Sequence, residues 1–206
     1  MLNKKNITQI ILLSVFIVGL FTSYYFTDVY FDVKENIVET VCLSCIKMDP
    51  APSMSFTFNT KNGKEHPDFI IDNLTKGPIF LAFRKTICDG CDIMDPLVEE
   101  VFNVEFGMDD HEEYIDFDGQ NIFFKHINVD TTKDEFKETY TIYGGAGVPM
   151  FVAITLGEDD GVIRPYYRLE YGTLGEDTDS GRKEFLRYMM IEAINNYEQY
   201  SDEYNR

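Results

Sequence analysis

Two cysteines that are separated by two residues are the side chains best placed for chemistry in this sequence. Cys88 and Cys91 stand in ICDGCDIMDP, after an apolar run and before a helical pattern. A thiolate attacks a disulfide, whereas a free cysteine, with a pKa near ~8.5, is mostly protonated at neutral pH. Backbone N–H groups and the positive dipole at a helix start would favour the thiolate of Cys88. When the Cys88 thiolate attacks another disulfide, a mixed disulfide forms. Cys91, one turn later, is spaced to attack that mixed disulfide.

Three uses of this pair fit its spacing: a redox pair, a metal clamp or a structural staple. The charges around it are mixed, because Arg84 and Lys85 favour a thiolate and Asp89 opposes it. No direction of exchange, reductant or oxidant, follows from them. A zinc site would combine this pair with the chain's second CxxC motif, at residues 42–45. The two motifs lie farther apart in the sequence than those of usual zinc sites. Neither a metal nor a cofactor is predicted, and His111 and His126 are expected to be surface residues or satisfied ones.

The N-terminal segment predicts a membrane anchor. Residues 7–26 carry no charge and would span roughly 30 Å as a helix, the thickness of a hydrocarbon core. Lys4 and Lys5 precede the segment and Asp28 and Asp32 follow it. The positive-inside rule then puts the N-terminus in the cytoplasm and the remainder outside. A cleaved signal peptide is the alternative, but no small-x-small cleavage site follows the apolar run.

A second CxxC pair, Cys42 and Cys45, lies in a predicted juxtamembrane stalk and linker over residues 28–52. In a helix, two sulfurs at this spacing share one face, one turn apart. Two interpretations stay open. The pair is a structural disulfide of the stalk, or it is a second redox pair that passes electrons between Cys88–Cys91 and a membrane redox partner.

The remaining residues, 53–206, are predicted to form one domain of alternating strands and helices. Residues 105–121 are interpreted as an acidic insertion in a solvated loop. Strands are expected at 55–60, 79–83, 121–129, 150–155 and 162–171, and helices at 66–74, 89–104, 133–143 and 181–200. This order predicts an α/β fold with a mixed sheet and helices on both faces.

The charge of the chain excludes one class of partner. It has 18 Lys and Arg residues against 36 Asp and Glu residues, a net charge of −18. Nucleic acid is not an expected partner, because phosphate binding needs clustered Lys and Arg side chains. The acidity is interpreted as keeping an exposed domain soluble rather than as a docking surface.

Taken together, these motifs resemble the thioredoxin superfamily over roughly residues 53–200. An apolar strand at 79–83 runs into the CxxC pair, and Pro96 follows where the family's long helix carries its kink proline. A strand that ends in NVD, residues 128–130, is similar to the family's third strand. The motif GVP then aligns Pro149 with the family's cis-proline, which lies beside the disulfide.

The resemblance implies a thioredoxin-like three-layer fold and thiol–disulfide exchange with protein thiols or disulfides as clients. Cys88 would be the nucleophile and Cys91 the resolving thiol, while the backbone of Val148 beside Pro149 would face the client. The alternative is a redox-inactive thioredoxin-fold adaptor whose cysteines are structural or bind a metal. An enzyme needs a Cys88 thiol that solvent can reach and that is more acidic than the Cys91 thiol.

Several positions differ from the family pattern. The family has Trp before the first cysteine and Gly-Pro between the two, where this chain has Ile87 and Asp89-Gly90. The buried Asp that relays a proton to the family's resolving thiol is replaced by Ala82. These differences favour a dedicated extracytoplasmic thiol–disulfide protein over a general reductant of the cytosolic type.

Overall fold

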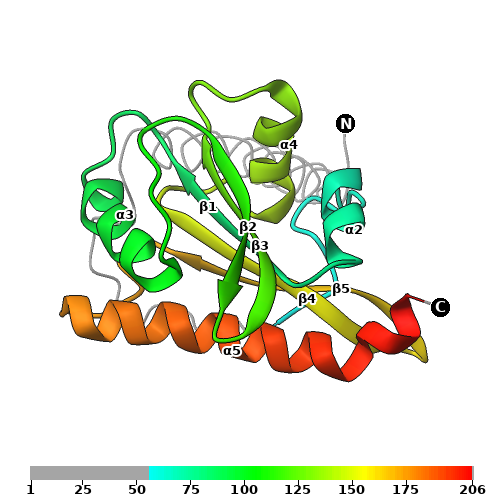
Figure 1. Ribbon diagram of the computed structural model, residues 1–206. Coiled ribbons are helices and arrows are strands. Elements are labelled where there is room, and N and C mark those ends of the chain that lie inside the picture. Colours follow the sequence, from blue (N-terminus) through cyan, green and yellow to red (C-terminus); the bar gives the residue numbers. More distant parts are fainter. Residues whose placement is uncertain (1–55, 206) are drawn as a thin grey trace, which may run out of the picture. The chain divides into compact units, whose positions relative to one another are not determined.

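A five-stranded mixed sheet lies at the centre of residues 56–205, the part of the chain that the computed structural model describes (Figure 1). The strands, in sheet order, are β2 (His111–Phe117), β3 (Gln120–Asn128), β1 (Ile79–Arg84), β4 (Met150–Asp159) and β5 (Val162–Tyr171). β1 and β3 pair in parallel, and the other neighbours pair antiparallel. The predicted α/β fold with a mixed sheet is therefore confirmed.

Helices cover both faces of this sheet, as predicted. They are α2 (Asp68–Leu74), α3 (Asp89–Phe102), α4 (Asp134–Tyr143) and α5 (Asp179–Tyr204). Side chains along β1 alternate between two cores, as the twofold repeat of a strand requires. Leu81 and Phe83 pack with α2 and α4, whereas Phe80 and Ala82 pack with α3 and α5. β1 is thus buried on both sides, which explains its unbroken apolar sequence.

The predicted acidic loop at residues 105–121 is wrong, because it contains β2. Asp118 and Gly119 adopt left-handed backbone angles, with φ of 53° and 88°, which suit a two-residue turn between β2 and β3. β2 lies at the edge of the sheet and is mostly exposed. Its acidic side chains therefore stay in water while its backbone pairs with β3.

Two other boundaries differ from the prediction. In place of a first strand, the described part of residues 55–60 makes an isolated bridge from Thr57 to Tyr167. α5 extends beyond both predicted ends and is capped by Thr178, whose hydroxyl accepts a hydrogen bond from the Gly181 N–H at 3.1 Å. Pro165 lies on the edge strand β5, a position that tolerates its missing N–H.

The predicted anchor and stalk, residues 1–52, lie outside the described residues, and so do Cys42 and Cys45. Among residues 56–205, no helix is long and apolar enough to cross a bilayer.

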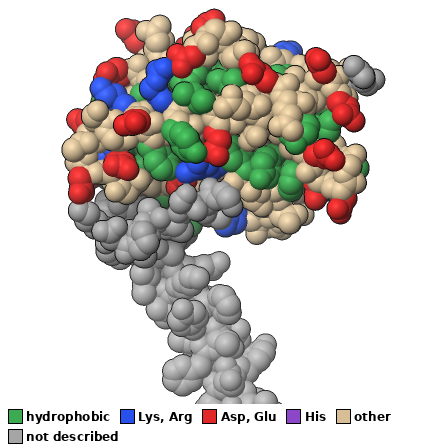
Figure 2. Space-filling view, turned by 90° about the horizontal axis from the view of Figure 1, so that it is seen from below, with side chains coloured by type: hydrophobic (Ala, Val, Ile, Leu, Met, Phe, Trp, Pro, Cys, Tyr) green, Lys and Arg blue, Asp and Glu red, His purple; other side chains and the backbone are tan. Residues whose placement is uncertain are grey.

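Charge on the face that carries α5 is spread between apolar side chains (Figure 2). The exposed apolar residues of α5 are Tyr188 and Ile191. Basic side chains are present among the acidic ones, and some make ion pairs, such as Arg187 with Asp118 at 2.7 Å. The negative charge visible on this face is therefore distributed rather than concentrated in one block.

Candidate functional site

Cys88 and Cys91 lie at the start of α3, as predicted, and are joined by a disulfide bond. Their Cα atoms are 5.2 Å apart. Cys88 is the N-cap residue of the helix, and its sulfur accepts a hydrogen bond from the Cys91 N–H at 3.1 Å. The first sulfur of the pair therefore sits at the positive end of a helix dipole.

Burial distinguishes the two cysteines. Cys91 is 0% exposed and Cys88 is 7% exposed, so Cys88 is the one that still reaches the surface. Ile87, immediately before it, is 91% exposed, although it is a large apolar residue. An exposed apolar side chain beside the accessible sulfur is a suitable contact for another polypeptide.

The loop before β4 packs against the cysteine pair. The Val148–Pro149 peptide bond is cis. A Cβ atom placed on Gly90 would lie 3.0 Å from Cδ of Pro149, so the glycine between the cysteines permits this close approach. Val148 is buried in the same apolar cluster as both sulfurs. The structure thus brings together the four residues predicted for this site, Cys88, Cys91, Val148 and Pro149.

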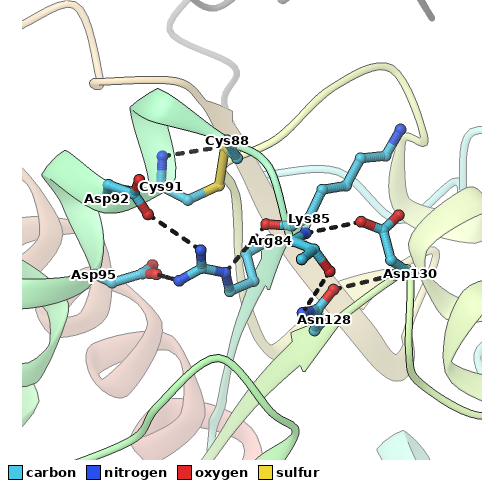
Figure 3. Close-up of a disulfide and its surroundings, with 9 residues drawn as sticks. Arg84, Lys85, Cys88, Cys91, Asp92, Asp95, Asn128 and Asp130 are labelled. Atoms are coloured by element: carbon cyan, nitrogen blue, oxygen red, sulfur yellow. Dashed lines mark hydrogen bonds and ion pairs between the residues drawn. A yellow bond between two sulfur atoms is a disulfide. The ribbon is translucent and has the colours of Figure 1, made fainter.

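The end of β3 braces the loop that leads into α3 (Figure 3). The Thr86 N–H donates to the Asp130 carboxylate at 2.8 Å, and the Asn128 amide donates to the Thr86 hydroxyl at 3.4 Å. The Val129 N–H donates to the carbonyl of Arg84 at 2.9 Å. The NVD segment therefore fixes the path of the chain just before Cys88.

A buried ion pair lies beneath the same helix. The side chain of Arg84, the last residue of β1, is 5% exposed and contacts the carboxylates of Asp95 and Asp92 (Figure 3). Burial raises the pKa of Asp95 to about 6, although Arg84 acts to lower it. Arg84 was predicted only as a charge near the cysteines, and Asp95 was not predicted as part of the site. The available signal was Arg84 itself, because a cation at the end of a buried apolar strand requires an acidic partner.

No family model matches this chain, and no curated protein is similar enough to it to count as a relative. A sulfur at a helix start, a buried second sulfur bonded to it and an adjoining proline loop form an arrangement suited to exchange of disulfide bonds.

Two histidines outside the cysteine pair are held in their neutral form. His66 bonds through Nδ1 to the Tyr143 hydroxyl at 2.8 Å, and His126 bonds through Nδ1 to the Asp109 carbonyl at 3.0 Å. Burial lowers the pKa of each to about 4. Of the two positions expected for His126, surface or satisfied, the structure shows a buried ring with a bonded Nδ1, on which Phe106 stacks at 4.1 Å. Its Nε2 has no hydrogen-bond partner among the described residues.

We expect the fold to lose stability in mild acid, with His126 as one cause. Its folded-state pKa of about 4 lies below the ordinary value of 6.5, so the unfolded chain takes up its proton first as pH falls. Between pH 6.5 and pH 5 this difference in proton binding lowers the free energy of unfolding by about 2 kcal/mol. Urea unfolding of wild type and of His126→Leu at pH 7 and pH 5 measures the loss of stability. The variant should lose less stability over this interval, and an undiminished loss would contradict the assignment.

Proposed function

We propose that this protein is a membrane-anchored, extracytoplasmic thiol–disulfide oxidoreductase of the thioredoxin superfamily. Cys88 is the nucleophile and Cys91 is the resolving thiol. The observation that carries the proposal is the difference between the two sulfurs. Cys88 caps α3 and reaches the surface, whereas Cys91 is fully buried and bonded to it.

The topology around the pair supports the same assignment. β1, α3 and β3 form a unit in which two parallel strands are linked through a helix, and the CxxC pair stands at its first strand–helix junction. An antiparallel hairpin, β4–β5, and α5 follow. Pro96 inside α3 and the cis bond before Pro149 agree with what the resemblance implies.

The proposed reaction transfers two electrons in two displacements. The Cys88 thiolate attacks one sulfur of a client disulfide, and the other client sulfur leaves as a thiolate. The Cys91 sulfur then attacks Sγ of Cys88, which releases the second client thiolate and leaves the Cys88–Cys91 disulfide. The same steps in reverse oxidise a client dithiol. The Cys91 N–H, 3.1 Å from the Cys88 sulfur, supports the thiolate.

A structural staple is a weaker explanation of this disulfide. The bond joins residues that are three positions apart, within one helical turn. Closing so short a loop removes little entropy from the unfolded chain, so it stabilises the fold by only about 2 kcal/mol at 25 °C. A disulfide that closes a 100-residue loop stabilises the fold by about 4.7 kcal/mol. If the protein were a redox-inactive adaptor, this disulfide would serve only to stabilise the fold, and the close spacing of its cysteines is poorly suited to that role.

The proposal includes the residues that would contact a client and the side of the membrane on which the domain would lie. The exposed side chain of Ile87 and the backbone of Val148 would contact the client on either side of Cys88. Residues 7–26 would hold the domain on the outer side of the membrane, where disulfides persist. Cys42 and Cys45 stay a predicted stalk disulfide or second redox pair.

A redox titration tests the proposal. The full chain, with Cys42→Ser and Cys45→Ser so that one pair remains, is equilibrated with glutathione buffers, and free thiols are counted by mass. We expect one reversible two-electron transition that Cys88→Ser abolishes. A potential near about −270 mV would indicate a reductant and one near about −120 mV an oxidant. A pair that does not titrate across this range would refute the enzyme and leave the adaptor.

A further inference from the structure

The proposed reaction requires the resolving thiol, Cys91, to lose its proton although it is buried. Cys91 is 0% exposed, so in the reduced protein its proton has no direct path to water. It must lose that proton before its sulfur attacks Sγ of Cys88, because a thiolate is the attacking species. A proton acceptor within the protein is therefore needed.

A carboxylate lies one helical turn from each cysteine. In α3, Asp92 follows Cys88 by four residues and Asp95 follows Cys91 by four, and residues at this spacing are neighbours on one helix face. The two carboxylates differ in exposure, because the Asp92 side chain is 70% exposed and that of Asp95 is 13% exposed. Asp95 is thus the shielded carboxylate, and it follows the shielded thiol.

The Arg84 guanidinium contacts both carboxylates (Figure 3). Its guanidinium comes from the end of β1, directly before the loop that carries Cys88. The position where the resemblance implies a buried acid is Ala82, which pairs with His126 of β3 and carries no titratable group. The shielded acid close to the cysteine pair therefore comes from α3 and not from β1.

We infer that Asp95, oriented by Arg84, accepts the proton of Cys91 when the mixed disulfide is resolved. This inference rests on the proposed function. In the step, the Cys91 S–H bond breaks and its proton moves to the Asp95 carboxylate. The Cys91 sulfur bonds to Sγ of Cys88, and the client sulfur leaves with the electron pair of the broken bond. The reverse step returns the proton from Asp95 to Cys91.

The charges around Asp95 suit this role. Burial has the largest effect and raises the pKa of Asp95, Arg84 lowers it, and Asp92 and Glu99 raise it further, so that the pKa is about 6. Beyond Arg84, His126 of β3 interacts with Arg84 and Asp110 and is neutral at pH 7. A carboxylate with this pKa is ionised at neutral pH and is a stronger base than an ordinary aspartate.

The test separates the two displacements by using an aromatic disulfide, dithiobis-nitrobenzoate. The reduced full chain, again with Cys42→Ser and Cys45→Ser, releases one coloured thiolate when Cys88 attacks and a second when Cys91 resolves the adduct. Stopped-flow absorbance from pH 5 to pH 9 gives both rates. Asp95→Asn is the test variant. Asp92→Asn is the matched control, because it makes the same change at the other carboxylate that contacts Arg84.

We expect Asp95→Asn to slow the second release roughly 100-fold or more at pH 7, because proton transfer to a positioned side chain typically contributes about 10²–10⁴-fold. The inflection of its pH profile should move from near pH 6 to the range of a thiol, while the first release keeps its rate. Asp92→Asn should keep the second rate at pH 7, and its inflection should lie only slightly below that of wild type, because the Asp92 carboxylate raises the pKa of Asp95. A wild-type second rate and profile in Asp95→Asn would overturn the inference and leave the proposed function intact.

A second pair of variants separates proton transfer from packing. Asp95→Glu keeps a carboxylate and Asp95→Gln removes it at the same size. Glu should retain the inflection near pH 6 and resolve faster than Gln. Equal rates and profiles in the two variants would overturn the inference. Absence of the first release from wild type would instead refute the proposed function itself.

Discussion

Cys91→Ser is expected to leave clients attached to Cys88 as stable mixed disulfides, whereas Cys88→Ser is expected to abolish exchange completely. The reason is the unequal burial of the sulfurs: Cys88 caps α3 and reaches the surface, and Cys91 is 0% exposed. A serine hydroxyl at position 91 does not displace the client, so the first adduct persists. Acid quenching after incubation with a synthetic disulfide-bonded peptide, followed by intact mass, measures the adduct.

The controls for this experiment remove the second CxxC pair. With Cys42→Ser and Cys45→Ser in every variant, any adduct on the chain must lie on Cys88 or Cys91. The double variant Cys88→Ser/Cys91→Ser sets the background. Equal adduct yields in the two single variants would show that the sulfurs are equivalent, as a staple requires, and would contradict the proposed roles.

Local sequence signals were sufficient for most of the fold and for the cysteine pair. The unbroken apolar run of β1 and the helical spacing after Cys88 predict a strand–helix junction, and both elements form there. The approach of Pro149 to Gly90 has no local signal, because these residues belong to segments far apart in the chain. They meet because β4 pairs with β1, and only the family resemblance anticipated it.

β2 was missed although a signal for it was present. Asp118-Gly119 between two runs with aromatic residues is a strong mark of a two-residue hairpin. The acidic residues around it were instead taken as a sign of solvation. An edge strand satisfies both descriptions, since one side of its backbone pairs with the sheet while most of its side chains face water.

The role of Asp95 could not be predicted from the helix alone. An aspartate in the early turns of a helix is ordinarily a solvated partner of the dipole. Asp95 differs because α3 packs over the end of β1, where Arg84 interrupts the apolar pattern with a buried charge. A cation at the end of a buried strand was the sequence feature that called for an acidic partner.

Arg84→Met is expected to destabilise the fold by about 3 kcal/mol at pH 7, because it leaves Asp95 buried without its cation. The loss should shrink at pH 5. The pKa of Asp95, about 6, lies above the ordinary value of 3.8, so the folded state binds its proton more tightly than the unfolded state. Below pH 6 the carboxyl is increasingly neutral in wild type too, and less ionic attraction remains to be lost. Urea unfolding at both pH values measures the difference.

Two further variants distinguish a buried ion pair from the general loss of a cation. Lys183→Met removes a more exposed pair with Glu100, 2.7 Å apart, and should cost less than about 1 kcal/mol. Arg84→Met/Asp95→Leu removes both buried charges and should recover most of the loss, because the carboxylate that still loses its partner, Asp92, is exposed to water. If the double variant were as unstable as the sum of its single changes, the two side chains would not be coupled. Arg84 would then stabilise α3 by packing alone, and the Asp95 pKa would have to depend on burial and its acidic neighbours without the guanidinium.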